Sequence, residues 1–64
     1  MKVGSMLKLK GNFRTLAAEH GWLWVYEGIG EYGDHSFQAV ATGFVGHSGN
    51  PCLGFENWDE DDNN

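Results

Sequence analysis

The chain has a single cysteine and a single proline, and no apolar run in it approaches the roughly 20 residues that a membrane-spanning helix needs. Cys52 alone cannot form an intramolecular disulfide, which favours a reducing compartment. The N-terminal segment also lacks the apolar stretch and small-residue cleavage site of a secretion signal. We therefore expect a cytoplasmic protein that does not associate with membranes.

Basic residues are scarce: there are four against nine acidic residues, and the formal net charge is −5. All four basic residues lie in the first quarter of the chain, at Lys2, Lys8, Lys10 and Arg14. Five acidic residues crowd the C-terminal end, at Glu56, Asp59, Glu60, Asp61 and Asp62. Because this charge repels phosphate, nucleic-acid binding is disfavoured and a larger protein partner with a basic surface is expected.

The length of 64 residues leaves room for one compact domain. Residues 1–55 are predicted to form a single small β-rich domain, and residues 56–64 an acidic flexible tail. A domain of this size buries only about 60% of the surface that its unfolded chain exposes, so its stability should be marginal. A homo-oligomer would add buried surface, and that alternative stays open.

Glycine, by contrast, is abundant: ten glycines divide the chain into segments too short for long helices. Alternating or β-branched and aromatic residues predict strands over residues 6–10, 22–26 and 36–45, with a short edge strand at 52–55. Residues 28–34 are predicted to form the hairpin loop between two antiparallel strands, and residues 46–51 a further loop. Short strands joined by turns should therefore dominate the fold.

Residues 13–20 fit two structures. Asn12 is a suitable helix N-cap, Phe13, Leu16, Ala17 and His20 follow helical spacing, and Gly21 can end the helix. Alternatively, this segment is a further strand of a meander. The glycine density favours the second alternative, and the pattern is similar to an SH3-like barrel. The predicted fold is therefore mainly β, a small antiparallel sheet or SH3-like barrel of four to five strands; the alternative is α+β with one short helix at 13–20.

The segment from Gly28 to Gly33 spells G-x-G-x-x-G after a predicted strand. A dinucleotide site also needs a following helix whose N-terminal amides face the pyrophosphate, whereas a β-branched, aromatic segment follows here. We interpret the motif as a flexible hairpin loop, and we predict no cofactor.

Possible metal ligands and nucleophiles are present but poorly arranged. His20, His35, His47 and Cys52 lack the two close pairs that structural zinc sites use, so no metal site is predicted. Asp34, His35 and Ser36 are consecutive residues next to a predicted strand, and consecutive strand residues point to opposite faces. No catalytic residues are therefore predicted, and we expect a protein that is not an enzyme. An enzyme assembled across an oligomer interface remains an alternative.

Three large aromatic residues, Trp22, Trp24 and Tyr26, share one face of the predicted central strand. They can form the core, which a short chain needs for its largest side chains. They can instead form an exposed platform that binds a partner. The core interpretation is slightly favoured.

The functional hypothesis is a non-enzymatic protein-binding module that modulates or inhibits a larger partner, encoded by a phage or another mobile element. Its partner-binding residues would be the aromatic group Trp22, Trp24 and Tyr26, and the acidic tail group Trp58, Asp59, Glu60, Asp61 and Asp62. The tail can instead serve only solubility. The alternative function is single-stranded nucleic-acid binding, with Lys8, Lys10 and Arg14 on phosphates and the aromatic platform stacking bases.

Overall fold

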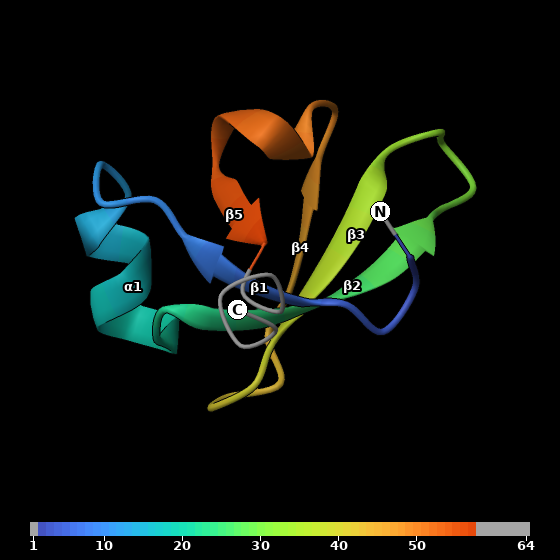
Figure 1. Ribbon diagram of the computed structural model, residues 1–64. Coiled ribbons are helices and arrows are strands. Elements are labelled where there is room, and N and C mark those ends of the chain that lie inside the picture. The colour runs from blue at the N-terminus through green and yellow to red at the C-terminus, as the bar shows by residue number, and fades with distance from the viewer. Residues whose placement is uncertain (1, 58–64) are drawn as a thin grey trace, which may run out of the picture.

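The computed structural model describes residues 2–57, which form a mainly β domain with one short helix (Figure 1). Its elements are β1 (Met6–Leu9), α1 (Arg14–His20), β2 (Leu23–Ile29), β3 (His35–Ala39), β4 (Val45–Ser48), the 3-10 turn η1 (Pro51–Leu53) and β5 (Phe55–Asn57). The strands form one antiparallel sheet in the order β4-β3-β2-β1-β5. The predicted small antiparallel, SH3-like fold is confirmed.

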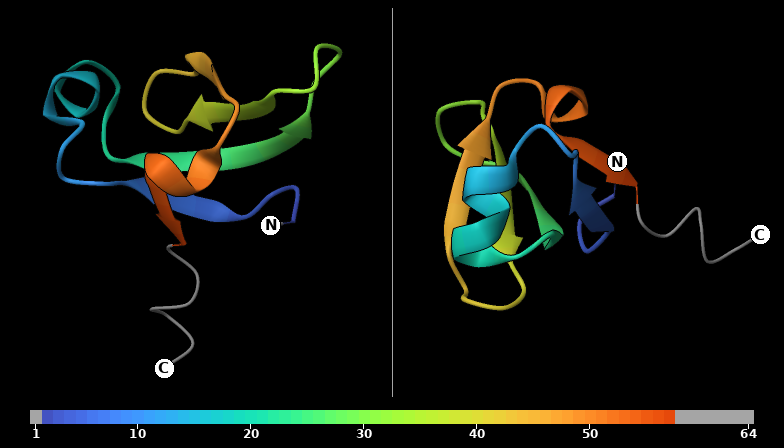
Figure 2. Two further views of the ribbon diagram at one scale, coloured as in Figure 1. Left: turned by 90° about the horizontal axis from the view of Figure 1, so that it is seen from above. Right: turned by 90° about the vertical axis from the view of Figure 1, so that its left-hand side faces the viewer.

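The sheet curls into a half-barrel, and α1 lies at one side of it (Figure 2). Strands β4 and β5 are the two edges of the sheet. The connection between them runs through η1 across the open side of the half-barrel. As a result, residues of β4 and of β5, which lie at opposite ends of the sheet, line the same space inside the half-barrel.

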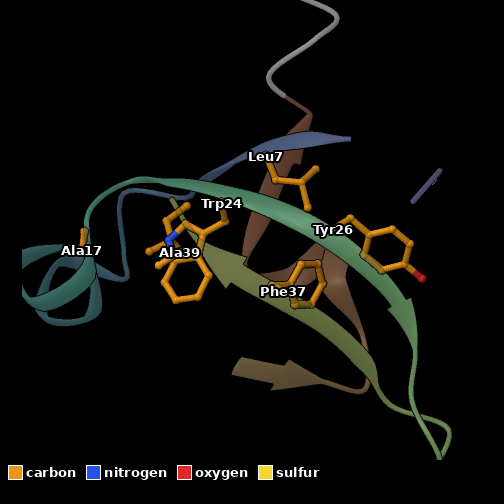
Figure 3. Packing of buried hydrophobic residues seen from close by; sticks show 7 residues of the cluster. Leu7, Ala17, Trp24, Tyr26, Phe37 and Ala39 are labelled. Atoms are coloured by element: carbon orange, nitrogen blue, oxygen red, sulfur yellow. The ribbon is translucent and has the colours of Figure 1, made fainter. Parts of the chain in front are cut away.

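The core consists of alternate residues of the three central strands, packed on the concave face of the sheet (Figure 3). The buried side chains are Leu7, Leu9, Trp24, Tyr26, Phe37 and Ala39 from the strands and Ala17 from α1. Phe55 of β5 closes over this cluster, because its ring stacks on that of Phe37 with 4.3 Å between centroids. This aromatic contact between β5 and β3 thus stabilises the curled shape of the sheet.

Residues 14–20 are helical, so the helix alternative holds for this segment and the strand alternative is wrong. The N-cap is Phe13 rather than Asn12, and no side-chain hydrogen bond caps the helix. Gly21 ends the helix with φ +90°, and its N–H donates to the carbonyl of Ala17 at 2.7 Å. Packing of the predicted apolar stripe stabilises this two-turn helix, because Ala17 is buried while Phe13 and Leu16 pack on the core.

The predicted strand over residues 36–45 is correct only for residues 36–39, which lie in β3, because the chain turns back after them. Residues 40–44 form a tight turn between β3 and β4. Gly43 adopts φ +77° and its N–H donates to the carbonyl of Ala39, while the N–H of Phe44 donates to the hydroxyl of Thr42. The left-handed glycine and the hydroxyl acceptor supply the turn without proline or asparagine.

The C-terminal segments also differ from the prediction. Residues 45–48 of the predicted loop form β4 instead, and η1 occupies the first part of the predicted edge strand. The edge strand itself is β5, shifted to Phe55–Asn57 and paired with β1. Glu56 and Asn57, which the sequence assigned to the tail, lie in this strand, whereas residues 58–64 lie outside the described residues.

Replacing Gly28 by alanine is expected to lower the free energy of unfolding by about 1–2 kcal/mol. Gly28 lies at the irregularity between β2 and β3 with φ +102°, and an added Cβ would stand 3.2 Å from Cγ2 of Val3. Gly30→Ala is the matched control, because φ at Gly30 lies outside the left-handed region and the nearest atom is 3.8 Å away. Urea unfolding of both variants checks the prediction, and an equal effect would contradict it.

Candidate functional site

An apolar groove of about 180 Å³ opens on the concave side of the sheet, between α1, β4 and β5. Trp24 and Phe37 line its base, Phe13 and Leu16 line it beside α1, and Phe55 lines it from β5. An apolar cavity of roughly 150 Å³ is large enough to bind benzene. The groove can therefore take one large apolar or aromatic side chain.

Strand β4 leaves the groove open because its concave-facing residues are small. Phe37 and Gly46 are register partners, and directly opposed residues place their side chains on the same face. Gly46 and Ser48 thus share the concave face with Phe37, and both line the groove. Gly46 has no side chain, and a Cβ added there would stand 3.6 Å from Phe44 and 3.8 Å from Trp24. The space between these two rings and β4 is therefore open.

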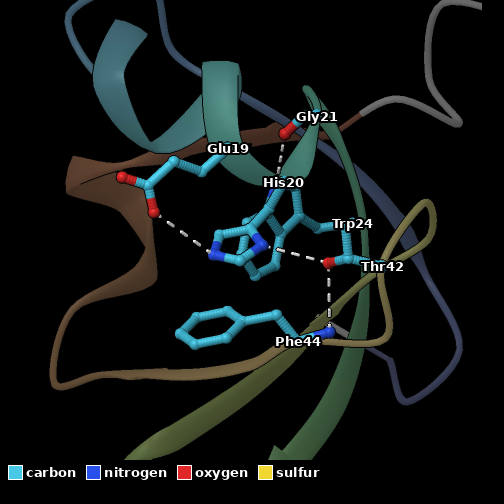
Figure 4. Close-up of polar contacts among 6 residues, drawn as sticks. All are labelled: Glu19, His20, Gly21, Trp24, Thr42 and Phe44. Carbon is cyan, nitrogen blue, oxygen red and sulfur yellow. Dashed lines mark hydrogen bonds and ion pairs between the residues drawn. The ribbon is translucent and has the colours of Figure 1, made fainter.

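A cluster of three rings fixes the end of the groove beside α1 (Figure 4). The His20 ring stacks on Phe44 with 4.1 Å between centroids and 10° between planes, and Trp24 meets both rings edge-on. His20 Nδ1 lies 3.0 Å from Thr42 Oγ1, and Trp24 Nε1 donates to the carbonyl of Gly21 at 2.9 Å. These contacts tie the helix end to the β3–β4 turn, so the groove wall at Phe44 is held in place.

The His20 and Phe44 side chains are expected to be energetically coupled. In a double-mutant cycle of His20→Ala and Phe44→Ala, the coupling free energy should be about 0.5–1.5 kcal/mol, because the stacked pair contributes beyond its buried area. Urea unfolding of the four proteins measures it. Lys2→Ala with Phe44→Ala serves as a control cycle, since Lys2 is exposed. Strictly additive losses for the first pair would contradict the prediction.

A second hollow of about 310 Å³ lies at the β2–β3 hairpin loop, and His47 of β4 lines both this hollow and the groove. The β2–β3 hairpin loop supplies its other walls, with Glu31, Asp34 and the highly exposed Tyr32. The loop is closed by a hydrogen bond from the N–H of Gly30 to the carbonyl of Asp34 at 2.8 Å. An acidic and aromatic hollow thus borders β4, the strand that also borders the apolar groove.

The predicted aromatic platform is wrong for two of its three residues. Trp24 is 1% exposed and Tyr26 is 5% exposed, so they belong to the core, the interpretation that the sequence slightly favoured. The Tyr26 hydroxyl is satisfied by His35 Nδ1 at 2.7 Å. Trp22 lies before β2 and is 43% exposed, so it alone of the three is available to a partner. The curl of the sheet encloses the concave face, which is why the larger rings face inward.

Of the three rings predicted to stack on bases, only Trp22 is exposed. Lys8 is exposed on β1 and is the register partner of Glu56, and Arg14 is exposed at the start of α1. Because Trp24 and Tyr26 are buried, they cannot stack on bases. The predicted tail residues Trp58, Asp59, Glu60, Asp61 and Asp62 lie outside the described residues.

The glycine motif at residues 28–33 lies at the end of β2 and in the following loop, and it leads into β3 rather than a helix. In residues 2–57, no group of three or more His, Cys, Asp or Glu side chains is arranged to hold a metal ion. Sequence reasoning missed the groove, whose walls come from Phe13, Leu16, Phe44 and Phe55. Phe44 and Phe55 lie in predicted strands, and Phe13 and Leu16 belong to the helical spacing of residues 13–20. No local signal indicated that these four side chains meet.

Comparisons with known proteins find no matching family model, curated protein or solved structure. Among the described residues, the one α-helix has seven residues, and no helix there is long and apolar enough to cross a membrane. Function must therefore be inferred from the groove and its surroundings.

Proposed function

We propose that this protein is a non-enzymatic protein-binding module that takes an apolar side chain of a basic partner protein into the groove. The observation that carries the proposal is the aromatic groove of about 180 Å³, open between two edges of one sheet. Binding pockets are typically concave, apolar and lined by aromatic side chains. Such pockets hold the few anchor side chains that contribute most of the binding free energy.

The groove walls are ordered before a partner arrives, which supports a binding role. Phe55 stacks on Phe37, and Phe44 is stacked on His20. A groove that is already formed costs little conformational entropy on binding. Binding then releases water from rings that are already in place.

The net charge of −5 supports a basic partner, because opposite charge accelerates association and discriminates against acidic surfaces. The acidic hollow at Glu31 and Asp34 places part of this charge next to His47 of β4, the strand that borders the groove.

A binding role is also consistent with the chemistry of the groove. The polar residues that line it are His47 and Ser48, which are neighbours on β4. Neighbouring residues of a strand point to opposite faces, so they do not form a nucleophile and base pair. The remaining walls are apolar or glycine.

The test uses the full chain and a labelled peptide, acetyl-Lys-Val-Lys-Phe-Lys-Val-Lys-amide, followed by fluorescence anisotropy. The same peptide with alanine in place of phenylalanine has the same charge and is the control. The phenylalanine peptide is expected to bind at least about tenfold more tightly, because one buried aromatic anchor contributes more than 1.4 kcal/mol. Equal affinity of the two peptides, or no binding of either, would contradict the proposal.

A shortened chain tests the proposed contribution of the acidic tail to the same binding. The truncation has to end at residue 57, because Phe55–Asn57 is a strand of the sheet. Loss of the four acids Asp59, Glu60, Asp61 and Asp62 should weaken peptide binding at low salt and leave binding at high salt unchanged. Unchanged affinity at both salt concentrations would assign the tail to solubility instead.

A further inference from the structure

We infer that the partner segment binds as an extended strand added to the outer edge of β4, with its alternate side chains entering the groove. This inference rests on the proposed function and names the form and chemistry of the partner at the same site. The segment would be antiparallel or parallel to β4, and it would alternate apolar residues with lysine or arginine.

The register of the sheet directs a row of backbone groups outward from β4. The N–H of Ala39 donates to the carbonyl of Phe44, so these two residues form a hydrogen-bonded pair of the β3–β4 ladder. Such pairs alternate with pairs whose backbone groups point away from each other. The pairs Gln38 with Val45 and Ser36 with His47 are of the second kind. The N–H and C=O groups of Val45 and His47 therefore face away from β3, toward the edge.

The edge of β4 is also accessible to another strand. Natural proteins protect edge strands with proline, lysine or a covering segment, and the sequence of β4 is Val-Gly-His-Ser. The four residues of β4 form the outer strand of the sheet in the described part of the chain. A short extended segment is the kind of occupant that such an edge pairs with.

A strand added there would place every second side chain over the groove. Side chains alternate between the two faces of a strand, so those beside Gly46 and Ser48 would face the concave side. Gly46 has no side chain, and the rings of Trp24 and Phe37 lie beneath. An apolar residue of the added strand would fill this space.

The other side chains of the added strand would lie on the face of Val45 and His47. His47 also lines the hollow that contains Glu31, Asp34 and the exposed ring of Tyr32. Carboxylates beside an aromatic ring attract a lysine or arginine side chain through its charge and through cation–π contact. Charge complementarity therefore selects a segment in which basic residues alternate with apolar ones.

Edge β5 is a poorer site for the same segment. It has three residues, and Phe55 projects into the groove and covers Phe37. A strand added to β5 would find its concave side already filled by this ring. Strand β4 is therefore the edge we assign.

The test uses two N-methylated forms of the peptide acetyl-Lys-Val-Lys-Phe-Lys-Val-Lys-amide and the full chain. One form carries N-methyl groups on alternate residues starting at the first lysine, and the other on the residues between. Because alternate N–H groups of a strand point to opposite edges, one form should bind at least about tenfold more weakly and the other should bind nearly as well as the parent peptide. Equal affinity of the two forms would overturn strand addition.

A protein variant tests the assigned edge. His47→Pro removes the outward N–H, and proline is tolerated on an edge strand where this group faces solvent. The variant should bind the parent peptide about tenfold more weakly than His47→Ala, which keeps the N–H. Circular dichroism confirms that both are folded. Equal affinity of the two variants would overturn the assignment to β4.

The outcomes separate the two proposals. If the phenylalanine and alanine peptides bind equally, the proposed function fails. If the phenylalanine peptide binds more tightly but the two N-methylated forms do not differ, the groove binds an apolar side chain and strand addition fails.

Discussion

Replacing Trp24 by alanine is expected to lower the free energy of unfolding by about 3–5 kcal/mol. Trp24 is 1% exposed and is the largest of the fully buried side chains. Its ring contacts His20, Phe44 and Phe55, and its Nε1 donates to the carbonyl of Gly21. The substitution therefore removes a ring shared by α1, the β3–β4 turn and β5, and leaves that carbonyl without its donor.

The effect should be large relative to the total stability. A domain of this length has a free energy of unfolding of roughly 3–10 kcal/mol, so the Trp24→Ala chain should be substantially unfolded at 25 °C. Circular dichroism and urea unfolding measure the loss. Trp22→Ala is the matched control, because Trp22 is partly exposed and its loss should cost under about 1 kcal/mol. Similar losses in both variants would contradict the assignment of Trp24 to the core.

Replacing Gly46 by valine is expected to weaken binding of the phenylalanine peptide at least about thirtyfold. The new side chain would point into the groove above Trp24 and occupy the space that the phenylalanine ring needs. Loss of a buried aromatic anchor typically costs about 2 kcal/mol or more. The fold should tolerate the change, because the nearest atom to the new Cβ is 3.6 Å away and valine favours strands.

Gly49→Val is the control for this variant. Gly49 follows β4, and no atom lies within 4 Å of an added Cβ there. Anisotropy titrations should therefore give the wild-type affinity for Gly49→Val, and urea unfolding should place both variants within about 1 kcal/mol of the parent. If Gly46→Val binds the peptide as tightly as Gly49→Val, the groove is not the binding site.

The sequence predicted the central sheet well, because its strands carry the signals on which such predictions depend. Leu7 and Leu9 alternate with lysines on β1, and both are buried. Residues 23–26 of the predicted strand form the first part of β2, and Trp24 and Tyr26 supply the core. Period-2 alternation reports burial of one face directly, so these elements could be placed without the structure.

The turn between β3 and β4 could not be predicted, because residues 36–45 contain many β-branched and aromatic residues and no strong turn signal. Only Thr42 and Gly43 mark the turn, and Thr-Gly is a weaker turn signal than Asn-Gly or Asp-Gly. The helix remained ambiguous for a related reason: seven residues are too few for propensity to decide, and tertiary packing of Leu16 and Ala17 determines the outcome.

The groove depends on contacts between distant residues, and no local pattern reports them. Phe13, Phe44 and Phe55 come from three separate segments, and the curl of the sheet brings them to one surface. The open position at Gly46 follows from its register with Phe37, which is set by the unpredicted turn. The candidate site could therefore not be predicted from the sequence, because the turn that sets this register was not predicted.

The most direct test of the binding groove is a residue-by-residue map of backbone amide shifts while the full chain is titrated with the phenylalanine peptide. The largest changes are expected at Val45 and His47 of β4, with further changes at Phe44 and Phe55 on the groove walls. Changes confined to the convex face of the sheet, around Leu23 and Val25, would contradict the account, as would a spectrum that the peptide does not alter.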